Sequence, residues 1–189
     1  MIDPIAALVV IDMQKGVLGL PTFSPTQVVL KHVVALAEAF RAKALPVVLV
    51  HVAWSPDMRD VLKTRVQAPP PARTLPADFS DFVEELRADS KRDILILKRQ
   101  WGAFYGTELD LQLRRRKVTN IVLCGIATSI GVESTARDAV ERGYNLTFAS
   151  DAMTDMNQDA HDRALQVIFP RIGEIGTTAE VLDLLQRAD

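Results

Sequence analysis

The sequence predicts an α/β fold, in which a six-stranded parallel sheet carries helices on both faces, in one domain over residues 1–189. Short apolar runs alternate along the chain with longer segments whose apolar residues recur at helical spacing, which is typical of strand–helix–strand units. The length suits one full core better than two, and 48% hydrophobic with 24% charged residues is typical of a globular domain. The predicted architecture is therefore three-layer α/β/α.

The apolar runs and the helical periodicity place the individual elements. We expect strands at residues 6–11, 45–52, 93–98, 119–124, 145–149 and 172–175. We expect helices at residues 25–42, 108–116, 128–142, 159–169 and 178–185, with a short helix or turn at residues 79–86. Caps support several of these bounds, because Ser24 and Pro25 suit the start of the first helix and Ser150-Asp151 suits a helix start after the fifth strand.

The first strand ends at a carboxylate. Residues 6–11 form an unbroken apolar run, as expected of a strand buried on both faces, and Asp12 follows directly. Ligands of open α/β sheets bind at the carboxyl ends of the strands, so Asp12 is a candidate functional residue. The alternative is a loop residue that caps nearby amides. His51, inside the second strand, is interpreted as a hydrogen-bonded core histidine and not as a ligand.

A long proline-rich loop follows the second strand at residues 53–78. Loops of this length in a compact domain usually have a function, as a lid or an interface. The loop carries cations that could meet an anionic ligand or could equally be solvated: Arg59, Lys63, Arg65 and Arg73. Its prolines are Pro56, Pro69, Pro70, Pro71 and Pro76.

The third strand ends at Lys98, a cation, as the first ends at an anion. The next nine residues contain two glycines and the aromatic residues Trp101, Phe104 and Tyr105. Such a segment is a tight loop that either builds the wall of a pocket or simply packs as an aromatic connection. Thr107 is placed to cap the helix that follows.

The fourth strand leads into the turn where we expect chemistry. Gly125 begins the turn, Thr128 and Ser129 are candidate caps, and Gly143 ends the helix. Backbone N–H groups at such a helix start are unpaired and point toward any ligand in the crevice. Cys124, the only cysteine, lies inside the apolar strand before the turn and is interpreted as structural.

Composition excludes several classes of function. A net charge of −2 gives no attraction for nucleic acid or anionic lipid, and no apolar run is long enough to cross a membrane. The start of the chain lacks the pattern of a signal peptide, and one cysteine allows no internal disulfide, so we expect a cytoplasmic protein. Motifs for dinucleotides, nucleoside triphosphates and serine triads are absent.

Three motifs together resemble the isochorismatase-like (cysteine) hydrolases. They are ALVVIDMQ at residues 7–14, KRQWGAFYGT at residues 98–107 and GIATSIGVESTARDA at residues 125–139. The resemblance covers essentially the whole chain and implies the strand order 3-2-1-4-5-6, which would bring Asp12, Lys98 and Gly131 together. It also implies a cis peptide between Ile126 and Ala127.

The resemblance assigns roles to these residues. Asp12 falls on the family's general base, Lys98 on its catalytic lysine, and Gly131 on the position where most members carry the nucleophilic cysteine. Expected substrate contacts are Trp101, Phe104, Tyr105, Ile126, Ala127 and Thr128. The D-x-H spacing of the metal-dependent amidases of the family is absent, so we expect no metal and no other cofactor.

Gly131 places the chain beside the branch of the family that has glycine at the nucleophile position. Isochorismatases proper carry this glycine and hydrolyse a vinyl ether with water, and their aspartate handles the protons. The chain departs from them at residues 127–129 and at Val132, which leaves the substrate open.

We therefore expect a small-molecule hydrolase that acts on a vinyl ether or a related C–O or C–N bond through Asp12 and Lys98. The alternatives are a catalytically silent member that binds a ligand or protein partner, and a domain in which Asp12 and Lys98 form only an ion pair. The resemblance also implies a homo-oligomer, a dimer or a tetramer, and the small residues Ser134, Ala136 and Ala139 would permit close helix approach.

Overall fold

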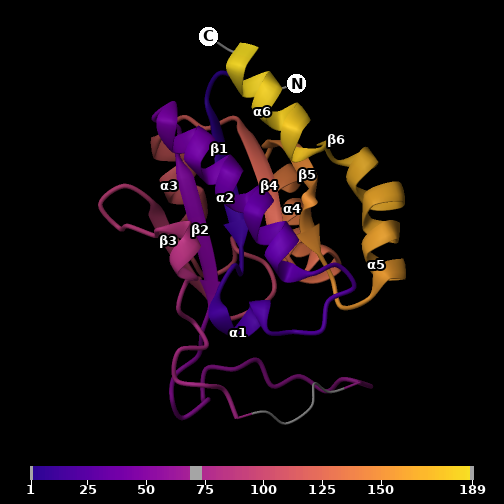
Figure 1. Cartoon of the computed structure of the whole chain (residues 1–189). Coiled ribbons are helices and arrows are strands. Elements are labelled where there is room, and N and C mark those ends of the chain that lie inside the picture. Colours follow the sequence, from indigo (N-terminus) through magenta and orange to yellow (C-terminus); the bar gives the residue numbers. More distant parts are fainter. Residues whose placement is uncertain (1, 69–73, 188–189) are drawn as a thin grey trace.

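The computed structural model describes residues 2–68 and 74–187. Six strands form one parallel sheet in the order β3-β2-β1-β4-β5-β6, so the predicted sheet and strand order are confirmed (Figure 1). The strands are β1 (Ala6–Ile11), β2 (Val47–Val52), β3 (Ile94–Lys98), β4 (Asn120–Ile126), β5 (Asn145–Thr154) and β6 (Glu174–Gly176).

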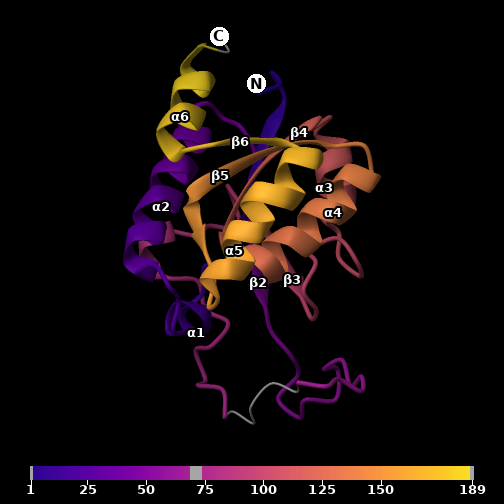
Figure 2. The same ribbon diagram turned by 90° about the vertical axis from the view of Figure 1, so that its right-hand side faces the viewer.

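Helices cover both faces of the sheet. On one face lie α2 (Thr26–Ala42) and α6 (Thr178–Arg187), and on the other lie α3 (Leu109–Arg115), α4 (Glu133–Glu141) and α5 (Gln158–Arg163) (Figure 2). Shorter turns of helix complete the described chain: α1 (Lys15–Leu18), η1 (Glu84–Leu86), η2 (Thr128–Val132), η3 (Ala164–Ile168) and η4 (Phe169–Arg171).

The central strands are apolar on both sides because two cores enclose them. In β1, Leu8 and Val10 belong to the cluster beneath α2 and α6, whereas Val9 and Ile11 belong to the cluster beneath α3 and α4. All six residues of β1 are buried. This explains why the sequence shows an unbroken apolar run instead of an alternation of apolar and polar residues.

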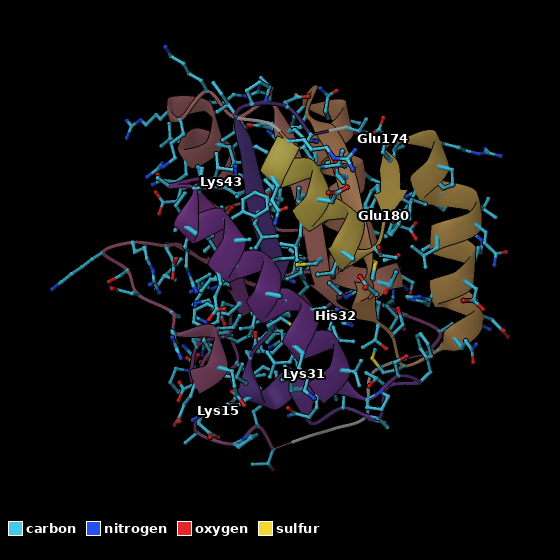
Figure 3. All side chains as sticks on the ribbon, turned by 45° about the horizontal axis from the view of Figure 1, so that its top comes forward. Lys15, Lys31, His32, Lys43, Glu174 and Glu180 are labelled. Carbon is cyan, nitrogen blue, oxygen red and sulfur yellow. The ribbon has the colours of Figure 1, made fainter. Side chains whose placement is uncertain are left out.

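α2 is amphipathic, and its outer side carries polar residues such as Lys31 and His32 (Figure 3). The helix begins at Thr26 with Pro25 as its N-cap, so the predicted cap at Ser24 is wrong. Thr26 instead donates its hydroxyl to the carbonyl of Leu18 at 3.1 Å, which ties the start of α2 to α1.

β5 is longer than the sequence predicts and continues through Ser150 and Asp151, the expected caps of the following helix. Asp151 caps a different helix: Oδ1 accepts the backbone N–H and the hydroxyl of Thr178 at the start of α6, at 2.6 and 2.7 Å. The pairing of β5 with β4 shifts register between Leu123 and Gly125, which accommodates the extra length.

The carboxyl ends of the strands lie at the end of the molecule that also carries α1 and the long loop, while both termini lie at the opposite end (Figure 1). Within the described part of the loop, the Trp54 indole donates to the carbonyl of Arg99 at 3.0 Å, and Arg99 pairs with Asp60. The loop is thereby attached to the end of β3. Of its predicted features, Pro69, Pro70, Pro71 and Arg73 lie outside the described residues.

Among residues 2–68 and 74–187, no helix combines the length and the apolar character needed to cross a bilayer.

Candidate active site

Three strand ends bring Asp12, Lys98 and Gly131 to one point. Lys98 Nζ donates to Asp12 Oδ2 at 2.8 Å, although the two residues are 86 positions apart in the chain. Gly131 faces the same pair, because a Cβ atom at this position would lie 3.4 Å from Lys98 Nζ and 3.5 Å from Asp12 Oδ2. The juxtaposition follows from the strand order, in which β1 neighbours β4 and only β2 separates β1 from β3.

Asp12 is a buried carboxylate with one unused oxygen. The residue is 7% exposed, and its backbone has a positive φ of 51° directly after β1. Oδ2 accepts from Lys98, but Oδ1 has no hydrogen-bond partner among the described residues. Burial raises the pKa of Asp12 to about 6, because desolvation outweighs the opposing charge and hydrogen bond of Lys98 and the smaller effect of His51.

Lys98 is 2% exposed and has two acceptors. Besides Asp12 Oδ2, the ammonium donates to the carbonyl of Trp101 at 2.8 Å. The second bond holds the start of the aromatic loop against the site. An ammonium has three donors, so one hydrogen of Lys98 has no acceptor in these two contacts and can meet a bound molecule or water.

The turn after β4 is built around residues that the sequence analysis did not single out. Asp155 Oδ2 accepts both the backbone N–H and the hydroxyl of Ser129 at 2.7 Å. The Thr128 hydroxyl donates to the carbonyl of Thr154 at 3.1 Å and lies 2.8 Å from His161 Nδ1. Thr128 and Ser129 therefore lie inside η2, which is one turn of π-helix, and their side chains do not cap a helix. The Ile126–Ala127 peptide is cis, as expected.

His161 and Asp155 anchor this turn from β5 and α5. His161 is buried beneath Phe23, with ring centroids 4.8 Å apart, and burial lowers the pKa of the imidazole. Asp155 follows the end of β5, as Asp12 follows the end of β1. The sequence did not reveal this position of Asp155, because the predicted strand ends at residue 149 and β5 continues to Thr154.

A cavity of about 360 Å³ opens at the crevice and is lined by Asp12, Lys98 and Gly131. Of the six predicted substrate contacts, Trp101, Ile126 and Ala127 line it. The apolar remainder of the wall, which the sequence analysis missed, includes Val17, Leu20, Val61, Leu62, Ile130 and Met156. Single apolar residues in turns and loops carry no pattern that distinguishes a pocket wall from ordinary packing.

The other three predicted substrate contacts lie outside the lining of this cavity. Phe104 is buried and packs against the ring of Tyr144, with centroids 5.9 Å apart. Tyr105 is 75% exposed and turns to solvent. Thr128 is fully buried, with its hydroxyl directed at Thr154 and His161. The aromatic loop therefore divides its side chains between the pocket, the core and the surface.

Other singled-out side chains have different surroundings. His51 Nδ1 lies 2.9 Å from the carbonyl of Ser80. Cys124 is buried, and its burial raises the pKa of the thiol far above the usual range. Arg59 lies beside Asp57, whereas Lys63 and Arg65 are exposed, and none of these three lines the cavity. Within the described ranges, no three His, Cys, Asp or Glu side chains are arranged to hold a metal ion.

Comparisons with known proteins agree with this arrangement. The isochorismatase domain matches residues 6–180. The chain is 48% identical over 180 residues to the uncharacterized isochorismatase family protein YecD of Escherichia coli O157:H7, covering 95% of both chains. It is 46% identical over 179 residues to the uncharacterized isochorismatase family protein YwoC of Bacillus subtilis (strain 168), covering 94% of this chain and 92% of the relative.

A solved structure of an isochorismatase family protein from Burkholderia thailandensis is similar over nearly the whole length. It has a TM-score of 0.94 and 45% sequence identity, and the match covers 98% of this chain and 97% of that chain.

Proposed function

The chain belongs to the isochorismatase family of hydrolases, and we propose that it hydrolyses a small molecule without a cysteine nucleophile. Asp12 transfers the protons, Lys98 holds Asp12 in place, and water adds to a vinyl ether or to a related C–O or C–N bond. The observation that carries the proposal is the buried 2.8 Å contact between Lys98 Nζ and Asp12 Oδ2 beside a glycine that has no side chain to attack anything.

For a vinyl ether the chemistry balances with these groups alone. Protonated Asp12 donates its proton to the terminal alkene carbon, which leaves an oxocarbenium ion. Water adds to the cationic carbon and returns a proton to Asp12. The resulting hemiacetal then breaks into an alcohol and a carbonyl compound. A carboxyl group with a pKa of about 6 suits this cycle, because both protonation states are populated near neutral pH.

Asp12 Oδ1 is the atom that would carry the proton. Oδ2 is occupied by Lys98, whereas Oδ1 has no partner among the described residues. Oδ1 is therefore the oxygen that can bind a proton, a water molecule or a substrate group. The raised pKa of Asp12 and its place in the cavity lining support a working acid or base over the alternative in which Asp12 and Lys98 form only an ion pair.

A silent family member that binds a ligand or a protein partner is the second candidate, because the pocket persists although the nucleophile is absent. The two candidates differ in turnover. Vinyl ethers, amides and acyl-anilides should be tested with the wild-type protein and with Asp12→Asn, which keeps the size of the side chain. We expect hydrolysis of a vinyl ether by the wild type and a loss of about 100-fold or more in Asp12→Asn.

Ligand binding is the control for this test, because Asp12→Asn should leave it largely intact. Trp54 and Trp101 line the cavity, so their fluorescence can report binding. Binding without turnover of any compound by the wild type would favour the silent candidate. Equal turnover by the wild type and Asp12→Asn would reject Asp12 as the proton-transfer group. The cytoplasmic location, expected from the sequence, stays a prediction.

A further inference from the structure

The cavity at Asp12 has a wall that is almost entirely apolar. Its lining comes from α1 and the residues after it, the long loop, the ends of β1, β2 and β3, the turn after β4 and the segment after β5. Two indoles, Trp54 and Trp101, contribute flat surfaces, and aliphatic or thioether side chains provide most of the remainder. Pockets of this kind gain affinity from apolar area and use a few polar groups to orient the ligand.

When Asp12 is ionised, above its pKa of about 6, the charged groups of the lining neutralise one another. Of the described residues around the cavity, only Asp12, Lys98 and Arg99 carry charge. Asp12 and Lys98 pair with each other at 2.8 Å, and Arg99 Nε lies 2.5 Å from Asp60 Oδ2. No cation of this lining is left without a carboxylate, and the loop cations Arg59, Lys63 and Arg65 lie outside it.

Asp60 keeps Arg99 neutralised across the working pH range. Its Oδ1 also accepts the backbone N–H and the hydroxyl of Ser55, both at 2.8 Å, so the loop fixes the carboxylate in place. The hydrogen bond from Arg99 is the largest effect on this group and lowers the pKa of Asp60 to about 2. Arg99 therefore meets a permanent counter-ion before any ligand arrives.

We infer that the substrate is an uncharged molecule with an apolar, flat body such as an aromatic ring, and that the pocket discriminates against carboxylates. Above about pH 6, where Asp12 is ionised and pairs with Lys98, a carboxylate would be desolvated among apolar side chains without an unpaired cation and close to the negative charge of Asp12. The inference rests on the proposed function for the reaction, but the binding preference holds whether or not hydrolysis occurs.

Two probes that differ by one carboxylate test this inference. Benzyl ethyl ether is uncharged, and 4-(ethoxymethyl)benzoate adds one negative charge to the same frame. Neither is a vinyl ether, so binding can be measured by tryptophan fluorescence or calorimetry without turnover, at about pH 8, where Asp12 is ionised. We expect the uncharged probe to bind more tightly by about tenfold or more. Equal or tighter binding of the benzoate, or no binding of either probe, would overturn the inference.

Asp60→Asn is the variant that should change the preference. It keeps the size of the side chain and an acceptor for Ser55 but removes the counter-ion of Arg99, so affinity for the benzoate should rise by about fivefold. Affinity for the uncharged ether should stay the same. Asp57→Asn is the matched control, because it changes the net charge equally but acts on Arg59, which does not line the cavity. A similar gain in both variants would contradict the role of Arg99.

Failure of this inference is distinguishable from failure of the proposed function. If benzyl vinyl ether is hydrolysed and its 4-carboxylate is hydrolysed as well, the function stands and the substrate class is wrong. If the uncharged probe binds selectively but no vinyl ether, amide or acyl-anilide reacts, the ligand class stands and the hydrolytic function is wrong.

Discussion

Burial and a neighbouring charge act on Asp12 in opposite directions, and burial has the larger effect. The pKa of Asp12 therefore rises from 3.8 to about 6, despite an ammonium 2.8 Å away. The folded protein retains this proton at pH values where the unfolded chain has lost it. The stabilising contribution is complete below pH 3.8 and is lost as the pH rises through about 6.

This linkage can be measured by comparing the wild type with Asp12→Asn. Between pH 4 and pH 7 the free energy of unfolding of the wild type should fall relative to the variant by about 2 kcal/mol, since one pKa unit corresponds to about 1.4 kcal/mol and part of the effect is already lost at pH 4. Denaturant melts at four or five pH values provide the difference, and all other titrating groups cancel in it. A difference that stays constant with pH would show that the pKa of Asp12 is not raised.

Gly131→Cys tests whether the pair still activates a thiol at the nucleophile position. The new Cβ would lie 2.9 Å from Ile11 Cγ2, so Ile11 must shift, and we expect a destabilisation of about 1–3 kcal/mol. A neighbouring cation lowers the pKa of a thiol, so the variant should react with iodoacetamide faster than buried Cys124 does in the wild type.

Gly131→Ala is the matched control for that variant, because it introduces the same Cβ without the thiol. Its free energy of unfolding should be close to that of Gly131→Cys, because both variants place the same Cβ against Ile11. Mass spectrometry after alkylation identifies which cysteine reacts. A thiol at position 131 as inert as Cys124 would mean that Asp12 and Lys98 do not act on this turn.

At the scale of elements, β4 can approach β1 closely only because it contains Gly125. A Cβ at this residue would lie 2.1 Å from the carbonyl oxygen of Ile11, and its φ is +118°. The contact fixes the turn after β4 next to Asp12, which is the residue after Ile11. The glycine therefore sets the distance between the two halves of the site.

Gly125→Ala should destabilise the protein severely, by about 4 kcal/mol or more, or prevent folding. Gly143→Ala is the control, because Gly143 also has a positive φ, of +82°, but nothing lies within 4 Å of its Cβ position. The control should cost about 1–2 kcal/mol, the backbone cost alone. Thermal melts measure both, and equal losses would show that the close approach to Ile11 is unimportant.

Much of this arrangement could be predicted from sequence, because strands buried on both faces are continuous apolar runs and their carboxyl ends share an edge. Asp12 follows such a run in β1, and Lys98 ends an apolar run in the edge strand β3, so their meeting follows once the strand order is known. The full length of β5 could not be predicted, because polar Ser150 and Asp151 interrupt its apolar run.

The anchors of the turn and the directions of the aromatic side chains were also beyond sequence reasoning. Asp155 and His161 act through contacts with residues 26–33 positions away in the chain, and no local pattern records such a contact. Trp101, Phe104 and Tyr105 share one loop, but only tertiary packing decides which of them faces the pocket.

At the scale of the whole molecule, we predict a homo-oligomer, at least a dimer. Two of the small residues expected at the contact between copies cannot reach another copy, since Ala136 and Ala139 are fully buried within one molecule. The described surface near the pocket instead exposes large side chains, with Trp101 65% and Tyr105 75% accessible. We therefore expect the contact between copies to bury this surface.

Light scattering at micromolar concentration tests the prediction, and a monomer would contradict it. Tyr105→Glu should weaken association by placing a charge in the contact. Val28→Glu is the control, because Val28 is similarly apolar and exposed but lies on α2, on the other face of the sheet. If Val28→Glu dissociates the oligomer and Tyr105→Glu does not, the contact between copies lies at α2 and not near the pocket.

The pH dependence of kcat/KM for an uncharged vinyl ether tests the central claim most directly. The free enzyme must carry a proton on Asp12, so the rate should be constant below about pH 6 and fall about tenfold per pH unit above it. Lys98→Met removes the charge that lowers the pKa of Asp12, so any remaining activity should fall at a higher pH. A wild-type rate that does not change between pH 4 and pH 8, or that rises through pH 6, would contradict the assignment of Asp12 as the proton donor.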